Sequence, residues 1–102
     1  MEHHVYFWFK DERKNDADRA AFEEGLRKLA QSRNLAAGTW GTSAPTPERP
    51  VTDHSWDYGI SFKFATLADH DAYQGDDPHH NEFVASFKDW WAKVLVMDLE
   101  PR

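Results

Sequence analysis

The sequence predicts an α+β domain in which a four-stranded antiparallel sheet carries helices on one face, a ferredoxin-like plan. Residues 2–10 and 53–64 alternate between large apolar and other side chains, as strands do. Two other segments, the one after Asn15 and the one after Asp77, repeat apolar residues at helical spacing. The resulting order of elements is β, α, ββ, αα, β, which fits one sheet in a single domain covering residues 1–102.

The first strand, residues 2–10, carries aromatic side chains on both of its faces. Val5, Phe7 and Phe9 share one face with His3, whereas Tyr6 and Trp8 lie on the other. Helices can cover only one of these faces, so the other needs a second cover. We therefore expect a homodimer that forms through the sheet face bearing Tyr6 and Trp8.

Three helix starts can be recognised from their capping residues. Asn15 precedes a helix whose apolar face ends near residues 32–34, and Thr66 with Asp69 resembles a capping box. Gly75 is expected to end that second helix with a positive φ. Asp77 and Pro78 then begin a third helix. The apolar stripes of the first and third helices are Phe22, Leu26, Leu29 and Ala30, and His80, Phe83, Val84, Phe87 and Trp91.

The remaining strands are predicted at 35–42, 53–64 and 92–99. Between the first two lies a proline-rich loop at 42–50. The last strand places Val94, Val96 and Asp98 on one face. The strand at 53–64 places five aromatic or aliphatic residues on one face: Trp56, Tyr58, Ile60, Phe62 and Phe64.

Composition limits the function classes. Apolar residues make up 40% of the chain and aromatic residues 15%, which is typical of a folded domain. A net charge of −6 without a basic cluster argues against nucleic-acid or anionic-membrane partners. The absence of cysteine, of a signal peptide and of a long apolar run leads us to expect a cytoplasmic protein.

His80 is the candidate for chemistry. It lies in the first turn of a helix, on the apolar stripe, where the helix dipole and burial both disfavour a charged imidazole. A neutral imidazole beside a pocket can act as a general base. The alternative is a packed core histidine bonded to the backbone.

Four stretches of the chain resemble a known family. They are the opening His-His-Val-Tyr-Phe-Trp-Phe-Lys, the strand Asp-Tyr-Gly-Ile-Ser-Phe-Lys-Phe leading to Asp-Ala-Tyr, the Pro-His-His at 78–80, and the closing Trp-Ala-Lys-Val-Leu-Val-Met-Asp. Together they resemble the stress-responsive A/B barrel (Dabb) family. This resemblance implies a dimeric α+β barrel.

The resemblance also implies a site. Cofactor-free polyketide cyclases of this family close a ring by aldol condensation, and their catalytic pair matches Tyr73 and His80. One more residue separates Tyr73 from Pro78 than in those enzymes. His80 would be the base, Tyr73 the donor to the enolate oxygen, and Asp98 or a backbone carbonyl would orient the imidazole. The implied pocket for a small apolar ligand comprises His3, Val5, Phe7, Phe22, Ile60, Phe83, Trp91, Val96 and Asp98.

Three alternatives remain open. The first is a non-catalytic stress-response or ligand-binding protein, in which residues such as Phe62 and Trp91 fill the space beside His80. The second is a metal site, although the cyclase chemistry needs no metal or other cofactor. The third, a related monooxygenase suggested by Trp8 and Trp56, is disfavoured because such aromatics are more often core. The metal site would draw on Asp69, His70, Asp71, Asp76, Asp77, His79 and His80.

Overall fold

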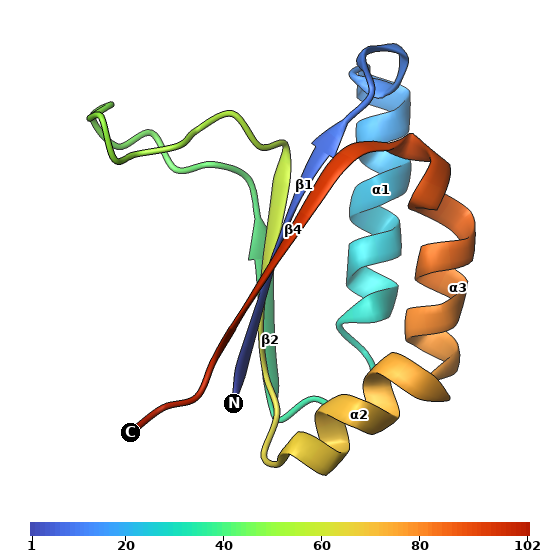
Figure 1. Cartoon of the computed structure of the whole chain (residues 1–102). Coiled ribbons are helices and arrows are strands. Elements are labelled where there is room, and N and C mark those ends of the chain that lie inside the picture. The colour runs from blue at the N-terminus through green and yellow to red at the C-terminus, as the bar shows by residue number, and fades with distance from the viewer.

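The computed structural model describes all 102 residues (Figure 1). Its strands are β1 (Glu2–Phe9), β2 (Ala37–Gly41), β3 (Tyr58–Lys63) and β4 (Trp91–Leu99), and its helices are α1 (Asp16–Leu29), α2 (Leu67–Gly75) and α3 (Pro78–Phe87). Short 3₁₀ turns occupy Asp11–Arg13 and Lys88–Trp90. The four strands form one antiparallel sheet in the order β2-β3-β1-β4, with all three helices on one face. The predicted ferredoxin-like fold is confirmed.

The strand register decides which side chains face the helices. His3 pairs with Asp98 on β4, and Val5 with Val96, so these residues share one face of the sheet. On the other side of β1, Val5 pairs with Ile60 of β3. The buried apolar core lies between this face and the helices and comprises Val5, Phe7, Phe9, Phe22, Leu26, Leu29, Tyr58, Ile60, Phe62, Phe64, Tyr73, Phe83 and Phe87.

Each predicted helix cap is present. The Asn15 side chain accepts a hydrogen bond from the Asp18 backbone at 2.9 Å, and Thr66 accepts one from Asp69 at 3.1 Å. Asp77 accepts from the backbone N–H of His79 at 2.8 Å. These bonds satisfy backbone donors that a helix start leaves without partners, so the helices begin where the capping residues predict.

Asp77 also ties α3 to the end of α1. Its carboxylate is buried and accepts from the Ser32 hydroxyl and, at 2.9 Å, from the Asn34 amide. Burial alone would raise the pKa of Asp77. The bonds from Ser32, Asn34 and the α3 backbone outweigh that effect and lower the pKa below its usual 3.8.

Replacing this carboxylate should therefore destabilise the fold. We expect Asp77→Ala to lower the free energy of unfolding by about 2 kcal/mol, because it removes a cap and leaves buried donors unpaired. The pKa of Asp77 is depressed in the folded state, so its contribution is present above pH 3.8 and is lost as pH falls through the folded pKa. Urea unfolding at pH 7 and pH 3 measures both effects. An equal loss of unfolding free energy at the two pH values would contradict a lowered pKa for Asp77.

Three local predictions were wrong. Trp56 does not share a face with Tyr58, because β3 begins only at Tyr58, and the Trp56 ring packs 5.1 Å from Tyr6 on the helix-free side. Gly75 is the last residue of α2 but does not have a positive φ, and Asp76 caps the helix at φ −110°. Trp91 does not continue the α3 helix but begins β4.

The neighbouring residue Asp57 explains why Trp56 lies outside β3. The Asp57 carboxylate accepts from the Phe9 backbone at 2.7 Å and from the Arg19 guanidinium at 2.9 Å. Asp57 is thereby fixed at the end of β1, and the chain enters the sheet only after it. Residues 42–57 form one long loop, which extends away from the sheet on the side opposite the helices (Figure 1).

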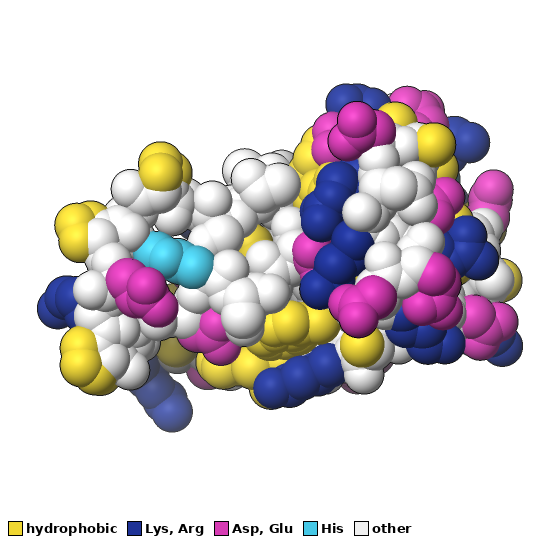
Figure 2. All heavy atoms as spheres, turned by 90° about the horizontal axis from the view of Figure 1, so that it is seen from above, with side chains coloured by type: hydrophobic (Ala, Val, Ile, Leu, Met, Phe, Trp, Pro, Cys, Tyr) yellow, Lys and Arg dark blue, Asp and Glu magenta, His cyan; other side chains and the backbone are white.

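The helix-free face of the sheet exposes apolar side chains. Tyr6 pairs with Leu95, and both are half-buried, while Met97 and Leu99 on β4 are more than half exposed. Figure 2 shows hydrophobic side chains exposed between the helical part of the molecule, which is covered by charged groups, and the loop. The loop covers this face only near Tyr6 and Trp8, through Trp56 and Ser55, and leaves Met97 and Leu99 uncovered.

None of the helices is both long and apolar enough to cross a membrane.

Candidate functional site

A cavity of about 130 Å³ lies between the sheet and the helices α2 and α3. Val94 and Val96 border it on the edge strand β4, where they are 39% and 49% exposed, so this side of the cavity is open to solvent. The lining is mainly apolar and consists of His3, Val5, Phe7, Leu29, Ile60, Tyr73, Gln74, His80, Phe83, Val84, Trp91, Val94 and Val96.

All predicted site residues except Phe22 and Asp98 line this cavity. Phe22 is fully buried behind it, with its ring 5.4 Å from that of Phe7, and belongs to the core. Asp98 lies on the cavity side of β4 but does not border the cavity. Sequence reasoning missed four lining residues, although Val94 shares a strand face with Val96: Leu29, Gln74, Val84 and Val94.

Tyr73 and His80 lie side by side at the cavity. Their ring centroids are 4.6 Å apart, so the additional residue between Tyr73 and Pro78 does not separate the pair. Asp77 holds the first turn of α3 and accepts from the His80 backbone at 3.4 Å, which helps to place the imidazole. Tyr73 belongs to α2 and His80 to α3, and only Asp76 and Asp77 separate these two helices along the chain.

The Tyr73 phenol remains protonated at neutral pH. Burial of the ring, which is only 1% exposed, and then repulsion by Asp77 raise its pKa above the usual 10.0. No group within the chain forms a hydrogen bond with its hydroxyl. A protonated phenol without a partner is free to donate to a ligand.

Asp98 binds His3 rather than His80. The His3 Nδ1 and an Asp98 carboxylate oxygen are 2.6 Å apart, as their cross-strand pairing requires. Burial lowers the pKa of His3 in spite of this hydrogen bond, which favours the neutral ring with Nδ1–H donating to Asp98. The predicted role of Asp98 in orienting His80 was therefore wrong, because β4 places the carboxylate opposite His3.

Trp91 adds a polar group that the sequence did not indicate. It borders the cavity, and its indole N–H is buried without a hydrogen-bond partner. Buried donors are rarely left unpaired, so this N–H is a second candidate, after Tyr73, for binding a ligand oxygen.

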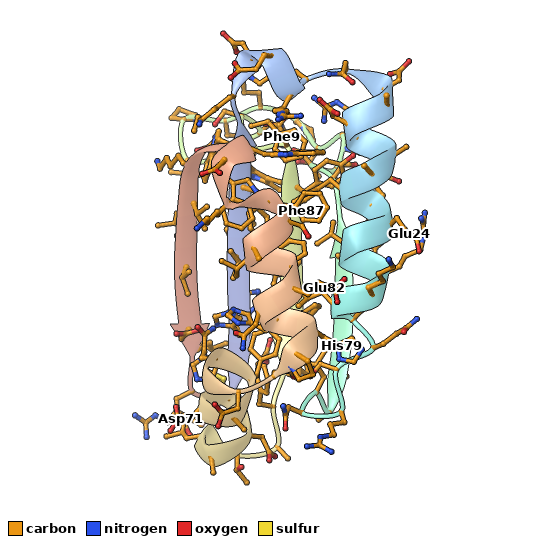
Figure 3. The ribbon with its side chains drawn as sticks, turned by 90° about the vertical axis from the view of Figure 1, so that its right-hand side faces the viewer. Phe9, Glu24, Asp71, His79, Glu82 and Phe87 are labelled. Atoms are coloured by element: carbon orange, nitrogen blue, oxygen red, sulfur yellow. The ribbon has the colours of Figure 1, made fainter.

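A larger groove of about 390 Å³ runs along the outer surface between α1 and α3. It is lined by charged and polar side chains that include Glu24, His79 and Glu82, which Figure 3 shows on the two facing helices. His79 points to this groove and not to the cavity. The groove contains neither Tyr73 nor His80, so we do not place the chemistry there.

Comparison with known proteins identifies the family. A sequence model of the Stress Responsive A/B Barrel Domain (Dabb) matches residues 1–101. The chain belongs to the Dabb family. A search among proteins of curated function found no match.

Solved structures confirm the Dabb fold. An Arabidopsis thaliana protein is 22% identical, with a TM-score of 0.79 over 99% of this chain and 94% of the other. A Mesorhizobium loti Dabb protein with a ferredoxin-like fold is 21% identical, with a TM-score of 0.76 over 99% and 95%. The hydroxynitrile lyase of Passiflora edulis is 21% identical, with a TM-score of 0.64 over 94% and 87%. Further neighbours, from Thermobifida fusca, Bacteroides fragilis and Jannaschia, are dimeric proteins of unknown function.

Proposed function

We propose that this Dabb protein is a homodimer that binds a small, mostly apolar carbonyl compound in the cavity, and that it makes or breaks a carbon–carbon bond there without a cofactor. The observation that carries this proposal is the pairing of Tyr73 and His80, 4.6 Å apart, at one mainly apolar cavity. Aldol-type chemistry requires a base that removes a proton from the substrate. It also requires a hydrogen-bond donor to the substrate oxygen on which negative charge develops.

The volume limits the ligand. A dry apolar cavity of about 150 Å³ in another protein accepts benzene, so about 130 Å³ suits a ligand of similar size. A long alkyl chain would have to leave through the open side at Val94 and Val96. Small aldehydes, ketones and their addition products are therefore better candidates than polyketides.

The hydroxynitrile lyase neighbour suggests one reaction of this class. His80 would accept the hydroxyl proton of an α-hydroxynitrile while the bond to the nitrile carbon breaks, leaving a carbonyl group and cyanide. Tyr73 would donate a hydrogen bond to the oxygen as negative charge develops on it. The protonated His80 would then return the proton to cyanide, so hydrogen cyanide leaves and the enzyme is restored.

The turnover of small α-hydroxynitriles tests this proposal. The purified protein should release cyanide from the cyanohydrin of acetone or benzaldehyde faster than buffer does. We expect His80→Ala to lower kcat/KM by about 10²–10⁴-fold, and Tyr73→Phe by about 10²–10³-fold. Since the Tyr73 hydroxyl has no partner in the chain, Tyr73→Phe should leave the unfolding free energy nearly unchanged.

His79→Gln is the matched control, because this histidine is one position from His80 but faces the outer groove. It should keep full activity. If the wild type neither cleaves α-hydroxynitriles nor catalyses aldol addition of small ketones, the catalytic proposal fails. The small cavity would then favour the second candidate, a non-catalytic ligand-binding protein of the stress-responsive type.

A further inference from the structure

Three side chains capable of binding a metal converge at the end of the sheet beside α2. His3 comes from β1, His70 from α2 and Asp98 from β4. One ligand atom of each residue lies within 4.8 Å of those of the other two. The cross-strand pair brings His3 and Asp98 together, and the His70 ring lies 5.0 Å from that of His3.

His70 carries a nitrogen that the fold leaves without a partner. Its Nδ1 lies 3.6 Å from the Asp71 carboxylate, while its Nε2 is buried and has no hydrogen bond. Nearly all buried polar atoms in proteins are paired. The side chain is only 16% exposed and packs edge-on against the Phe64 ring, so this nitrogen is shielded from bulk solvent.

We propose that His3, His70 and Asp98 bind one divalent transition-metal ion, with Nε2 as the His70 ligand. Two imidazoles and one carboxylate suit Zn²⁺, Fe²⁺ or Co²⁺, whereas Mg²⁺ and Ca²⁺ prefer oxygen ligands. Three protein ligands leave at least one position for water or a substrate oxygen. His3 also lines the cavity, so that position lies next to it.

Neighbouring side chains can orient the two imidazoles. Asp71, which Figure 3 shows on α2, lies beside Nδ1 of His70 and can accept its N–H. The Gln74 amide nitrogen lies 3.5 Å from Nε2 of His3. With the amide group turned by 180°, its oxygen would accept from the Nε2–H of His3 when the ion replaces the proton on Nδ1. Carboxylate and amide groups of this kind commonly hold metal-binding histidines.

This set differs from the metal hypothesis based on residues 69–80, of which it keeps only His70. The Asp77 carboxylate caps the start of α3 by accepting from the His79 backbone, and the His79 side chain faces the outer groove. The inference goes beyond the proposed function, because neither Tyr73 nor His80 is a ligand. Metal binding can therefore fail while the cavity chemistry holds, and the reverse is equally true.

Titration with Co²⁺ and Zn²⁺ tests the site. Untagged full-length protein, first treated with a chelator, should bind one Co²⁺ per chain with a visible absorption band that Zn²⁺ abolishes. We expect His70→Leu and Asp98→Asn each to weaken binding by at least about tenfold. His54→Gln, which changes an exposed loop histidine, should bind as the wild type does.

Two further measurements keep the result interpretable. Circular dichroism establishes that each variant is folded, and His70→Gln replaces His70→Leu if the latter is not. In the wild type, NMR should show the ring signals of His3 and His70 shifting on Zn²⁺ addition, while those of His54 stay unchanged. Absence of one-to-one binding, or equal affinity in His70→Leu and the wild type, would overturn the proposal.

Discussion

Phe22→Ala is expected to lower the free energy of unfolding by about 4 kcal/mol, a large part of the stability of a domain this small. Phe22 is fully buried on α1, where it joins the helix layer to the sheet. The Ala variant would leave a cavity that the surrounding rings cannot collapse to fill. Those rings, with centroids 4.9–5.4 Å from that of Phe22, belong to Phe7, Phe9, Tyr58, Phe83 and Phe87.

The measurement is urea unfolding followed by circular dichroism, with both proteins at one concentration because an oligomer's stability depends on it. Phe22→Leu is the control and should cost about half as much, since it keeps most of the buried volume. The family resemblance placed Phe22 in the ligand pocket. A cost of less than about 1 kcal/mol for Phe22→Ala would agree with that placement and contradict the core position described here.

Met97→Asp is expected to dissociate the proposed homodimer. Met97 is 54% exposed on the helix-free face and lies beside His4 in the β1–β4 register, on the face that bears Tyr6 and Trp8. In a two-fold symmetric interface each substitution acts twice. A cost of about 2 kcal/mol per copy would raise the dimer Kd by about 1,000-fold.

Analytical ultracentrifugation at micromolar concentration measures this effect. Leu67→Asp is a matched control, because Leu67 is 57% exposed but begins α2 on the helical side. It should remain dimeric. A monomeric wild type, or dissociation of the Leu67 variant but not of the Met97 variant, would rule out the helix-free face as the interface.

Much of the fold could be predicted because alternation and capping are local signals. The period of two along β1 assigned Val5 and Phe7 to the core, and Asn15, Thr66 and Asp77 marked the helix starts. Trp56 misled the prediction because alternation continues through it. The bonds from Asp57 to Phe9 and Arg19, which decide where β3 begins, join residues distant in sequence.

The candidate site was predictable only in part, for the same reason. Residues that alternate on β1 and β4 line the cavity as expected, and the family resemblance supplied Tyr73 and His80. The partner of Asp98 depends on the strand register, which places it opposite His3. The sequence marked His70 as a possible metal ligand but with the wrong partners, because its neighbours in space, His3 and Asp98, are 67 residues before it and 28 after it.

The most direct test of the account is whether a small apolar molecule binds beside Tyr73 and His80. Methyl NMR spectra of the protein titrated with benzaldehyde report on the valine side chains around the cavity. We expect saturable shifts at Val5, Val84 and Val96, and none at the exposed loop residue Val51. Shifts absent from these three residues, or confined to the outer groove near Ala21, would contradict it.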